Sequence, residues 1–304
     1  MTDTKQPGGR PAGGPASCKG ITALVTGASR GLGREIAGAL ASAGASVALA
    51  ARSRADLEAA REGIETRLAP DARVLCCPVD LSAKGAAEEL CRALKDAGME
   101  PDVLVNNAAV QGPIGPFWEN DWSEWEGSFR LNAFSPLLLC RAFLPGMVRR
   151  KWGKVVFISG GGATGPRARF SAYGAAKTLL VRFAETLAAE LAGTGVEANA
   201  IAPGAMKSAM TQAIISAGPA AAGEKEFASA QKLFQGTAEV VPRAAALCVF
   251  LCSHQADGIS GKLISAAWDP WESLVEHRQE LAATDVYSLR RIVPRDRGLD
   301  WGVS

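Results

Sequence analysis

The chain has 304 residues, 48% of them hydrophobic and 21% charged, a composition that suits a folded globular protein with a sizeable buried core. Lys and Arg number 33 against 31 Asp and Glu, so the formal net charge is only +2, and charge implies neither a nucleic-acid nor a membrane-surface partner. Because His254 and His277 are the only histidines, a His-rich metal site is excluded and a Ser-His-Asp hydrolase has few candidates.

Short apolar runs alternate with Ala- and Leu-rich stretches of helical period from Ile21 onward, whereas residues 1–20 are rich in Gly and Pro and predict a disordered leader. We expect strands over Ile21–Thr26, Ser46–Ala51, Arg73–Val79, Val103–Val105, Val155–Ser159, Val196–Ile201 and Lys262–Ser265. We expect helices over Gly31–Ala43, Ala55–Leu68, Ala83–Ala97, Trp122–Arg150, Ser171–Ala192 and Glu239–Cys252. This alternation predicts an α/β domain over 21–267, with a seven-stranded parallel sheet covered by helices on both faces.

Three places depart from this alternation. Pro136 and Pro145 lie inside the long fourth helix and predict a kink or a break there. The stretch 205–236 is too long for a plain connection and is a candidate substrate lid. The extension 268–304 is expected to pack on the domain as a flap over the pocket or on a partner subunit.

The first strand is followed by a glycine-rich loop that leads directly into a helix, an arrangement that suits the pyrophosphate of a dinucleotide. Glycines let the backbone approach the phosphates, and the helix N-terminus offers unpaired N–H groups. The predicted cofactor-binding residues of this loop are Gly27, Ser29, Arg30, Gly31, Leu32 and Gly33.

The end of the second strand carries the information on cofactor choice. An acidic residue there would bind the ribose hydroxyls of NAD and repel a 2′-phosphate, but this chain has Arg52 and Ser53. Arg52 and Arg30 offer guanidinium groups suited to a phosphate, so the sequence predicts NADP(H). The alternative is that both are solvated surface arginines.

The spacing G-x-x-x-G-x-G, together with four further motifs, resembles the short-chain dehydrogenase/reductase family over about Ile21 to Ala267. These motifs are Asn106-Asn107-Ala108-Ala109 after the fourth strand, Asn132 in the next helix, the Y-x-x-x-K pair Tyr173 and Lys177, and Pro203-Gly204 after the sixth strand. The resemblance implies a Rossmann-like doubly wound fold. It also implies further cofactor contacts at Asp80, Leu81, Asn106, Ala108, Tyr173, Lys177, Pro203, Gly204 and Ser208. Asp80 as a helix cap and Asn106 as the closure of a turn are the structural alternatives.

Tyr173 and Lys177 are the predicted chemical centre. One helical turn separates them, so the ammonium is expected to favour the tyrosinate and to lower the pKa of Tyr173. The resemblance implies that Lys177 also holds the nicotinamide ribose and that Asn132 supports a proton relay. Asn132 has the structural alternative of a satisfied polar residue that kinks the long helix.

The family's substrate-binding serine stands thirteen residues before the tyrosine, where this chain has Gly160. Ser159 is its neighbour, but a shift of one residue on a strand points a side chain to the opposite face. Three explanations stay open. The glycine run brings Ser159 inward as a catalytic residue, a substrate hydroxyl or water supplies the missing donor, or the protein is a weak or inactive relative.

The sequence therefore predicts an NADPH-dependent ketone reductase, or the reverse alcohol dehydrogenase, acting on a small metabolite such as a keto-sugar or a polyketide-like compound. The alternatives are a redox-neutral epimerase or dehydratase and a dinucleotide-binding regulator. The charged residues around Arg167, Arg169 and Glu119–Glu126 are interpreted as solvated faces, with binding of a charged substrate as the alternative. Trp118, Trp122 and Trp125 are expected to pack the long helix or to line the pocket rim, and Trp268 and Trp271 to close the pocket or to pack on a partner subunit. Seven cysteines without a CxxC pair, and no apolar span, predict a reduced cytoplasmic protein. The Ala-rich fifth helix suits a homodimer or homotetramer.

Overall fold

A single parallel sheet forms the centre of the molecule in the computed structural model, which describes residues 16–235 and 240–301. The strand order is β3-β2-β1-β4-β5-β6-β7. The strands are β1 (Thr22–Thr26), β2 (Ser46–Ala51), β3 (Val74–Pro78), β4 (Val103–Asn106), β5 (Gly153–Ile158), β6 (Val196–Ala202) and β7 (Leu263–Ser265). This confirms the predicted seven-stranded fold. Most of the predicted leader lies outside the described residues.

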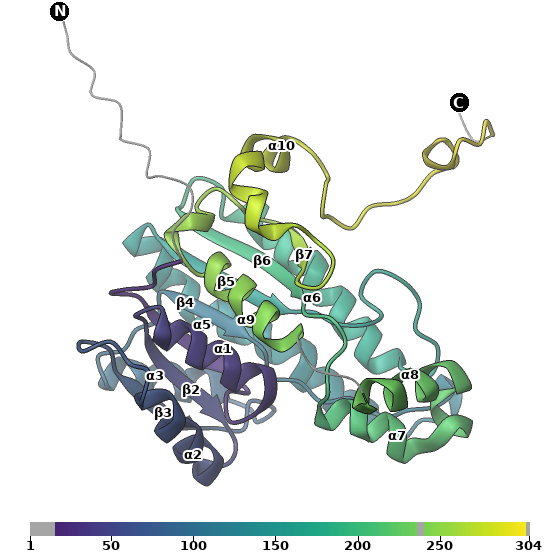
Figure 1. Ribbon diagram of the computed structural model, residues 1–304, viewed down its shortest axis with the longest axis horizontal. Helices are drawn as coiled ribbons and strands as arrows, with labels where there is room; N and C mark the ends of the chain where they lie inside the picture. Colours follow the sequence, from purple (N-terminus) through teal and green to yellow (C-terminus); the bar gives the residue numbers. More distant parts are fainter. Residues whose placement is uncertain (1–15, 236–239, 302–304) are drawn as a thin grey trace, which may run out of the picture.

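Helices connect the strands and cover both faces of the sheet (Figure 1). They are α1 (Gly31–Ser42), α2 (Arg54–Glu65), α3 (Ala86–Asp96), α4 (Trp122–Phe129), α5 (Ser135–Arg150), α6 (Ser171–Glu190), α7 (Ala209–Ala222), α8 (Glu224–Gln235), α9 (Val240–Leu251) and α10 (Arg278–Ala283). The predicted start of the helix before β7, Glu239, lies outside the described residues.

Alternation along the strands produces two apolar cores. In β1, Ala23 and Val25 face the core formed with α1, α2 and α9, whereas Leu24 faces the core formed with α3, α5 and α6. The strands are buried on both faces, as a parallel sheet between helix layers requires. The loops at the carboxyl ends of β1, β4, β5 and β6 consequently meet at one edge, which is where ligands bind in this class of sheet.

The long helix predicted over Trp122–Arg150 changes geometry directly before Pro136, one of the two places where a kink was expected. A π turn (η2, Arg130–Phe134) separates α4 from α5 and ends just before Pro136, which occupies the first turn of α5, where proline is tolerated. Pro145 lies inside α5. By length and composition this 29-residue stretch could cross a membrane, yet α5 packs on α3 and β5 as a layer of the domain.

The predicted lid contains two helices that the sequence did not predict. α7 and α8 pack on one another and extend beyond one end of the sheet (Figure 1). Gly218, at φ 75°, bends α7 near its end. Phe170, which precedes α6, is fully buried against Ile214, Ala222 and Ala230 of these helices. The stretch is therefore a packed helical layer over the loop before α6.

The C-terminal extension docks on the domain as far as Leu289 and then runs away from it (Figure 1). Lys262 Nζ donates to the carbonyls of Thr284 and Val286, both at 2.9 Å, and the Leu263 N–H donates to Tyr287 at 2.8 Å. Tyr287 thus pairs with the edge of the sheet at β7. Beyond Leu289, the exposed residues include Ile292, Leu299 and Trp301.

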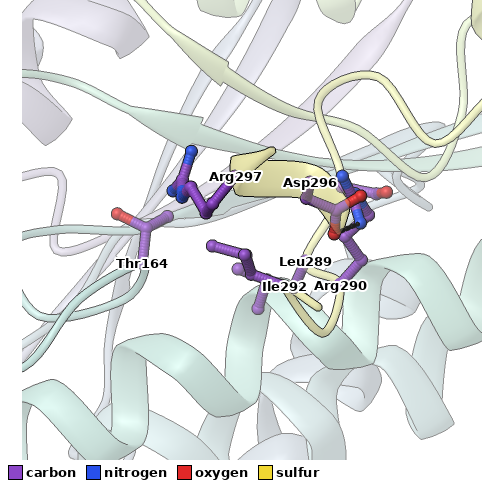
Figure 2. A pocket seen from close by; sticks show the side chains of 7 residues that line it. Thr164, Leu289, Arg290, Ile292, Asp296 and Arg297 are labelled. Carbon is purple, nitrogen blue, oxygen red and sulfur yellow. Dashed lines mark hydrogen bonds and ion pairs between the residues drawn. The ribbon is translucent and has the colours of Figure 1, made fainter. Parts of the chain in front are cut away.

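A pocket of about 320 Å³ lies between this extension and the loop after β5. Figure 2 shows Thr164 on one side of it, with Ile292, Arg290 and Asp296 on the other. Arg290 Nη1 and Asp296 form an ion pair at 2.7 Å. Of the two tryptophans expected to close the pocket or to pack on a partner subunit, Trp268 is exposed and Trp271 packs on Phe250, with ring centroids 5.7 Å apart.

Candidate active site

The glycine loop after β1 is in direct contact with the loop after β4. Thr26 Oγ1 accepts the N–H groups of Asn107 and Ala108 at 2.9 and 3.0 Å, and Asn107 Nδ2 donates to Thr26 O at 2.9 Å. A Cβ on Gly33 would lie 2.3 Å from Gly27 O, so no side chain fits at that position. Glycine is therefore required where the helix meets the loop.

The N-terminus of α1 is open. Arg30 stands at the N-cap position in an extended conformation and makes no capping hydrogen bond with its side chain. The first N–H groups of the helix thus lack a side-chain acceptor, and Gly27 and Gly31 adopt φ values of +65° and +55°. A backbone bend, a cradle without side chains and an open helix terminus together fit a dinucleotide pyrophosphate.

The predicted 2′-phosphate side is exposed at the end of β2. Arg52 and Arg30 are both exposed, and Ser53 caps α2 by accepting the Asp56 N–H at 3.2 Å. Asp80 accepts two hydrogen bonds from Ser82, which lower the pKa of its carboxyl, and Arg52 adds to this effect. Asp80 therefore closes a local turn and lies within electrostatic reach of Arg52.

The remaining predicted cofactor residues lie at the same edge. Asn106 is buried at the end of β4, and Leu81 O accepts the hydroxyl of Ser135. Gly204, with φ +90°, follows Pro203 after β6, and a Cβ there would lie 2.7 Å from Val240 Cγ2. Ser208 caps α7 by accepting the Thr211 N–H at 3.2 Å. Leu81, Gly204 and Ser208 thus also have structural roles, whereas the buried amide of Asn106 has no hydrogen-bond partner among the described residues.

Asn132 lies in the π turn and is fully buried. Its Oδ1 accepts the Val110 N–H at 2.9 Å and its Nδ2 donates to Val110 O at 2.8 Å. The side chain thereby fixes the loop after β4 to the long helix. π turns are frequent at functional sites because they redirect side chains within a helix.

Tyr173 and Lys177 lie in the first two turns of α6, both buried. Lys177 Nζ donates to Ile158 O at 2.7 Å and lies 5.5 Å from the centre of the Tyr173 ring. Burial lowers the pKa of Lys177 to about 8. An ammonium with a lowered pKa beside a buried phenol is a pair suited to proton transfer near neutral pH.

The expected decrease in the pKa of Tyr173 is wrong for this structure. Burial raises the pKa of Tyr173, because the phenolate loses solvation, and the charge that opposes this effect belongs to Arg167. Lys177 instead faces the Ile158 carbonyl. The sequence spacing placed the two side chains close together but could not give the cost of desolvation.

Gly160, rather than Ser159, faces the tyrosine. A Cβ on Gly160 would lie 2.5 Å from the Tyr173 hydroxyl oxygen, so the tyrosine occupies the space that a side chain would need. The Ser159 hydroxyl is buried and has no hydrogen-bond partner among the described residues. A catalytic role of Ser159 stays a prediction.

Two arginines in the loop before α6 bind the α7–α8 layer. Arg167 Nη2 and Nε donate to Glu226 Oε2 at 2.7 and 3.2 Å. Arg169 Nη1 donates to the carbonyls of Ala220 and Ala221 at 2.7 and 3.1 Å. The interpretation of these arginines as solvated is therefore wrong, because both are tied to the α7–α8 layer. No sequence signal separates such arginines from surface ones.

An aromatic stack borders the site beyond Ser171. Trp125 stacks between Trp122 and Phe129, with centroids 5.1 Å from each, and its indole N–H donates to Ser171 Oγ at 3.0 Å. Trp118 is 82% exposed. Of these tryptophans, Trp125 packs the long helix onto the start of α6, as the packing interpretation expected.

Comparison with known proteins agrees with this geometry. The family model described as short chain dehydrogenase matches residues 21–218. A short chain dehydrogenase of Pseudocercospora fijiensis is 38% identical over 192 residues, covering 62% of this chain and 61% of that protein. The chain thus spans less than two thirds of that relative. The D-beta-hydroxybutyrate dehydrogenase of Cupriavidus necator is 31% identical over 255 residues, covering 80% of this chain and 95% of that protein.

A solved structure shows the same fold. The putative NAD(P)-dependent gluconate 5-dehydrogenase from Beutenbergia cavernae, whose structure contains NADP, matches with a TM-score of 0.72 and 29% identity. The match covers 83% of this chain and 97% of that one. The glycine loop, the tyrosine and the lysine of this chain therefore lie on a fold that holds a nicotinamide dinucleotide in a similar protein.

Proposed function

Because this chain belongs to the short-chain dehydrogenase/reductase family and is an oxidoreductase of that type, we propose that it uses NADP(H) to reduce a ketone to a secondary alcohol, or to catalyse the reverse reaction. The observation that carries the proposal is the buried pair Tyr173 and Lys177 at the same edge of the sheet as the glycine cradle. A proton donor close to a dinucleotide site is the minimum that carbonyl reduction requires.

The chain's own residues handle the proton and the geometry. When bound, the cofactor would supply the hydride for the new C–H bond, and the carbonyl π electrons would pass to the oxygen that Tyr173 protonates. Tyr173 donates its hydroxyl proton to the ketone oxygen and becomes a tyrosinate, which solvent then reprotonates. Lys177 stabilises that negative charge. The hydrogen bonds between Asn132 and Val110 hold the loop after β4 in place.

NADP(H) is proposed over NAD(H) because of charge at the end of β2. No acidic side chain follows that strand, and Arg52 and Arg30 are exposed there. A guanidinium binds a phosphate through charge-assisted hydrogen bonds. The similar structure that contains NADP gives further support.

The substrate is proposed to be a small, polyhydroxylated ketone. Gly160 opens no extra room for a bulky one, because the Tyr173 hydroxyl fills the position that a side chain would take. Similar structures include a putative gluconate dehydrogenase, whose name indicates a polyhydroxylated substrate. We further propose a cytoplasmic location, since all seven cysteines are free thiols. We also propose a homo-oligomer built through the Ala-rich helix α6.

NADPH oxidation over a panel of ketones tests this proposal, with wild type compared with Tyr173→Phe. We expect turnover of at least one ketone by wild type and a loss on the order of 100- to 10,000-fold in the variant, the range of a general acid. Binding of NADPH without oxidation on any ketone would favour the alternative that Gly160 suggests, a dinucleotide-binding regulator.

A further inference from the structure

With glycine at position 160, the hydrogen bond that a serine there would give to the substrate oxygen is missing, and Tyr173 is the donor that remains in the motif. Hydrogen bonds to an oxygen that gains negative charge stabilise the transition state, and losing one in other enzymes slows turnover on the order of 100- to 1000-fold. A second donor must lie close to both the glycine run and the tyrosine hydroxyl to replace the missing one.

Arg167 lies along that glycine run. A Cβ on Gly161 would be 3.5 Å from Arg167 Nη1, and a Cβ on Gly162 would be 3.4 Å from Arg167 Cβ. The guanidinium also stacks on the Phe170 ring, with its carbon 4.0 Å from the ring centre. The side chain is only 16% exposed, so its position is fixed by packing.

Two of the three guanidinium nitrogens of Arg167 have partners. Glu226 Oε2 accepts from Nη2 and Nε, whereas Nη1 makes no hydrogen bond to any residue in the described part of the chain. The nitrogen without a partner is the one beside Gly161. Because a guanidinium nitrogen carries strong donors, a fixed Nη1 is available to an oxygen entering the site.

The charge of Arg167 also reaches the tyrosine. It opposes the increase that burial causes in the pKa of Tyr173, which places the guanidinium and the phenol within electrostatic range of one another. The geometry agrees, because Tyr173 adjoins Gly160 and Arg167 Nη1 adjoins Gly161, the next residue of the glycine run.

We propose that Arg167 Nη1 donates the hydrogen bond to the substrate oxygen that the glycine at position 160 cannot donate. This inference rests on the proposed ketone reduction and adds a catalytic residue to it. The proton that forms the new O–H bond still comes from Tyr173, and Arg167 stays protonated throughout. Glu226 is a positioning residue, since it holds the guanidinium with Nη1 facing the glycines.

Three variants separate the role of Arg167 as a hydrogen-bond donor from its role in holding the loop before α6 to α7 and α8. Arg167→Met removes both, Glu226→Gln removes the ion pair but keeps the guanidinium, and Arg169→Met removes a different tie between the same loop and the same lid. We expect kcat on a ketone that wild type reduces to fall about 100-fold or more in Arg167→Met, and by less than about tenfold in the other two.

Guanidinium added to the solution can replace the missing side chain, which gives a second test of the donor role. In Arg167→Ala, millimolar guanidinium should restore part of kcat, whereas it should leave Glu226→Gln and Arg169→Met unchanged. Equal losses in Arg167→Met and Arg169→Met, or no rescue, would overturn the donor role while leaving ketone reduction intact. If wild type reduces no ketone, the proposed function itself fails, and this inference fails with it.

A second readout does not depend on turnover. The chain has two tyrosines, so in a Tyr287→Phe background the ¹³Cζ NMR signal of labelled tyrosine reports Tyr173 alone. Arg167→Met should raise the pKa of Tyr173, and Arg169→Met should change it much less. An unchanged tyrosine titration in Arg167→Met would show that the guanidinium is not beside the phenol and would overturn the inference.

Discussion

Lys177 and Tyr173 are held by different surroundings, and this difference determines how each can act. Lys177 is buried with one acceptor, Ile158 O, and its pKa falls to about 8. Tyr173 is buried with its hydroxyl against the backbone of Gly160, and its pKa rises. At neutral pH the lysine is charged and the tyrosine protonated, which is the state that reduction needs.

Ketone reduction should therefore weaken as pH rises through about 8, where Lys177 loses its proton. Burial lowers the pKa of Lys177 from the ordinary value of 10.5, so the lysine is fully protonated only well below pH 8. Without the ammonium the tyrosinate formed in the reaction is less stable, and kcat/KM should decline about tenfold per pH unit. The pH dependence of kcat/KM measures this.

The control for that profile is Lys177→Arg. Its guanidinium stays protonated throughout, so its residual activity should not decline in the same range. A wild-type profile that stays flat well above pH 8 would show that the charge of Lys177 is not used.

Cofactor choice should depend on Arg52. Loss of a charge-assisted hydrogen bond of about 1.5–3 kcal/mol should raise the NADPH dissociation constant about 10- to 150-fold in Arg52→Ala, with little effect on NADH. Fluorescence titration measures both constants. Arg67→Ala, an exposed arginine just after α2, is the matched control. An unchanged NADPH constant in Arg52→Ala would refute the phosphate contact.

At the scale of elements, pairs of segments far apart in sequence are held by a few buried polar contacts. Asn132 ties the π turn to the loop after β4, and Arg167 and Arg169 tie the loop before α6 to α7 and α8. On the opposite edge of the sheet, Lys154 of β5 is fully buried and paired with Glu197 of β6 and with Asp257, the latter at 2.6 Å. This second group lies away from the catalytic residues.

Lys154→Met should destabilise the fold without a direct effect on chemistry. Removing the lysine leaves the Glu197 carboxylate, 16% exposed, without its cation. Loss of one partner of a buried ion pair costs about 3–5 kcal/mol, and we expect about 3 because Asp257 is 47% exposed. Urea denaturation measures this, with the exposed Lys151→Met as control. Equal stability of the two variants would contradict the ion pair's role.

At the scale of the whole molecule, periodicity and turn residues were enough to predict the sheet. The alternation of apolar and helical runs placed all seven strands within a few residues, because parallel strands buried on both faces have a strong apolar signal. Helices α7 and α8 were not predicted, since Gly218-Pro219 and Gly223 interrupt the apolar periodicity of this stretch. The docking of Tyr287 on β7 depends on a distant partner and has no local signal.

The residues of the candidate site that belong to sequence motifs could be predicted, but the directions of their side chains could not. The glycine loop, Tyr173 and Lys177 follow from spacing, and the structure brings them to one edge. That Gly160 faces the tyrosine, and that Arg167 lies beside the glycines, follow from tertiary packing. Burial likewise raises the pKa of Tyr173, whereas the spacing of Tyr173 and Lys177 predicted a decrease.

The most direct test of the central claim is hydride transfer from NADPH that carries deuterium at the transferred position of the nicotinamide, with mass analysis of the product. If the protein reduces a ketone, the alcohol gains one deuterium on carbon, and Tyr173→Phe suppresses its formation. Turnover that yields a product without deuterium and without net NADPH oxidation would contradict ketone reduction and indicate a redox-neutral reaction.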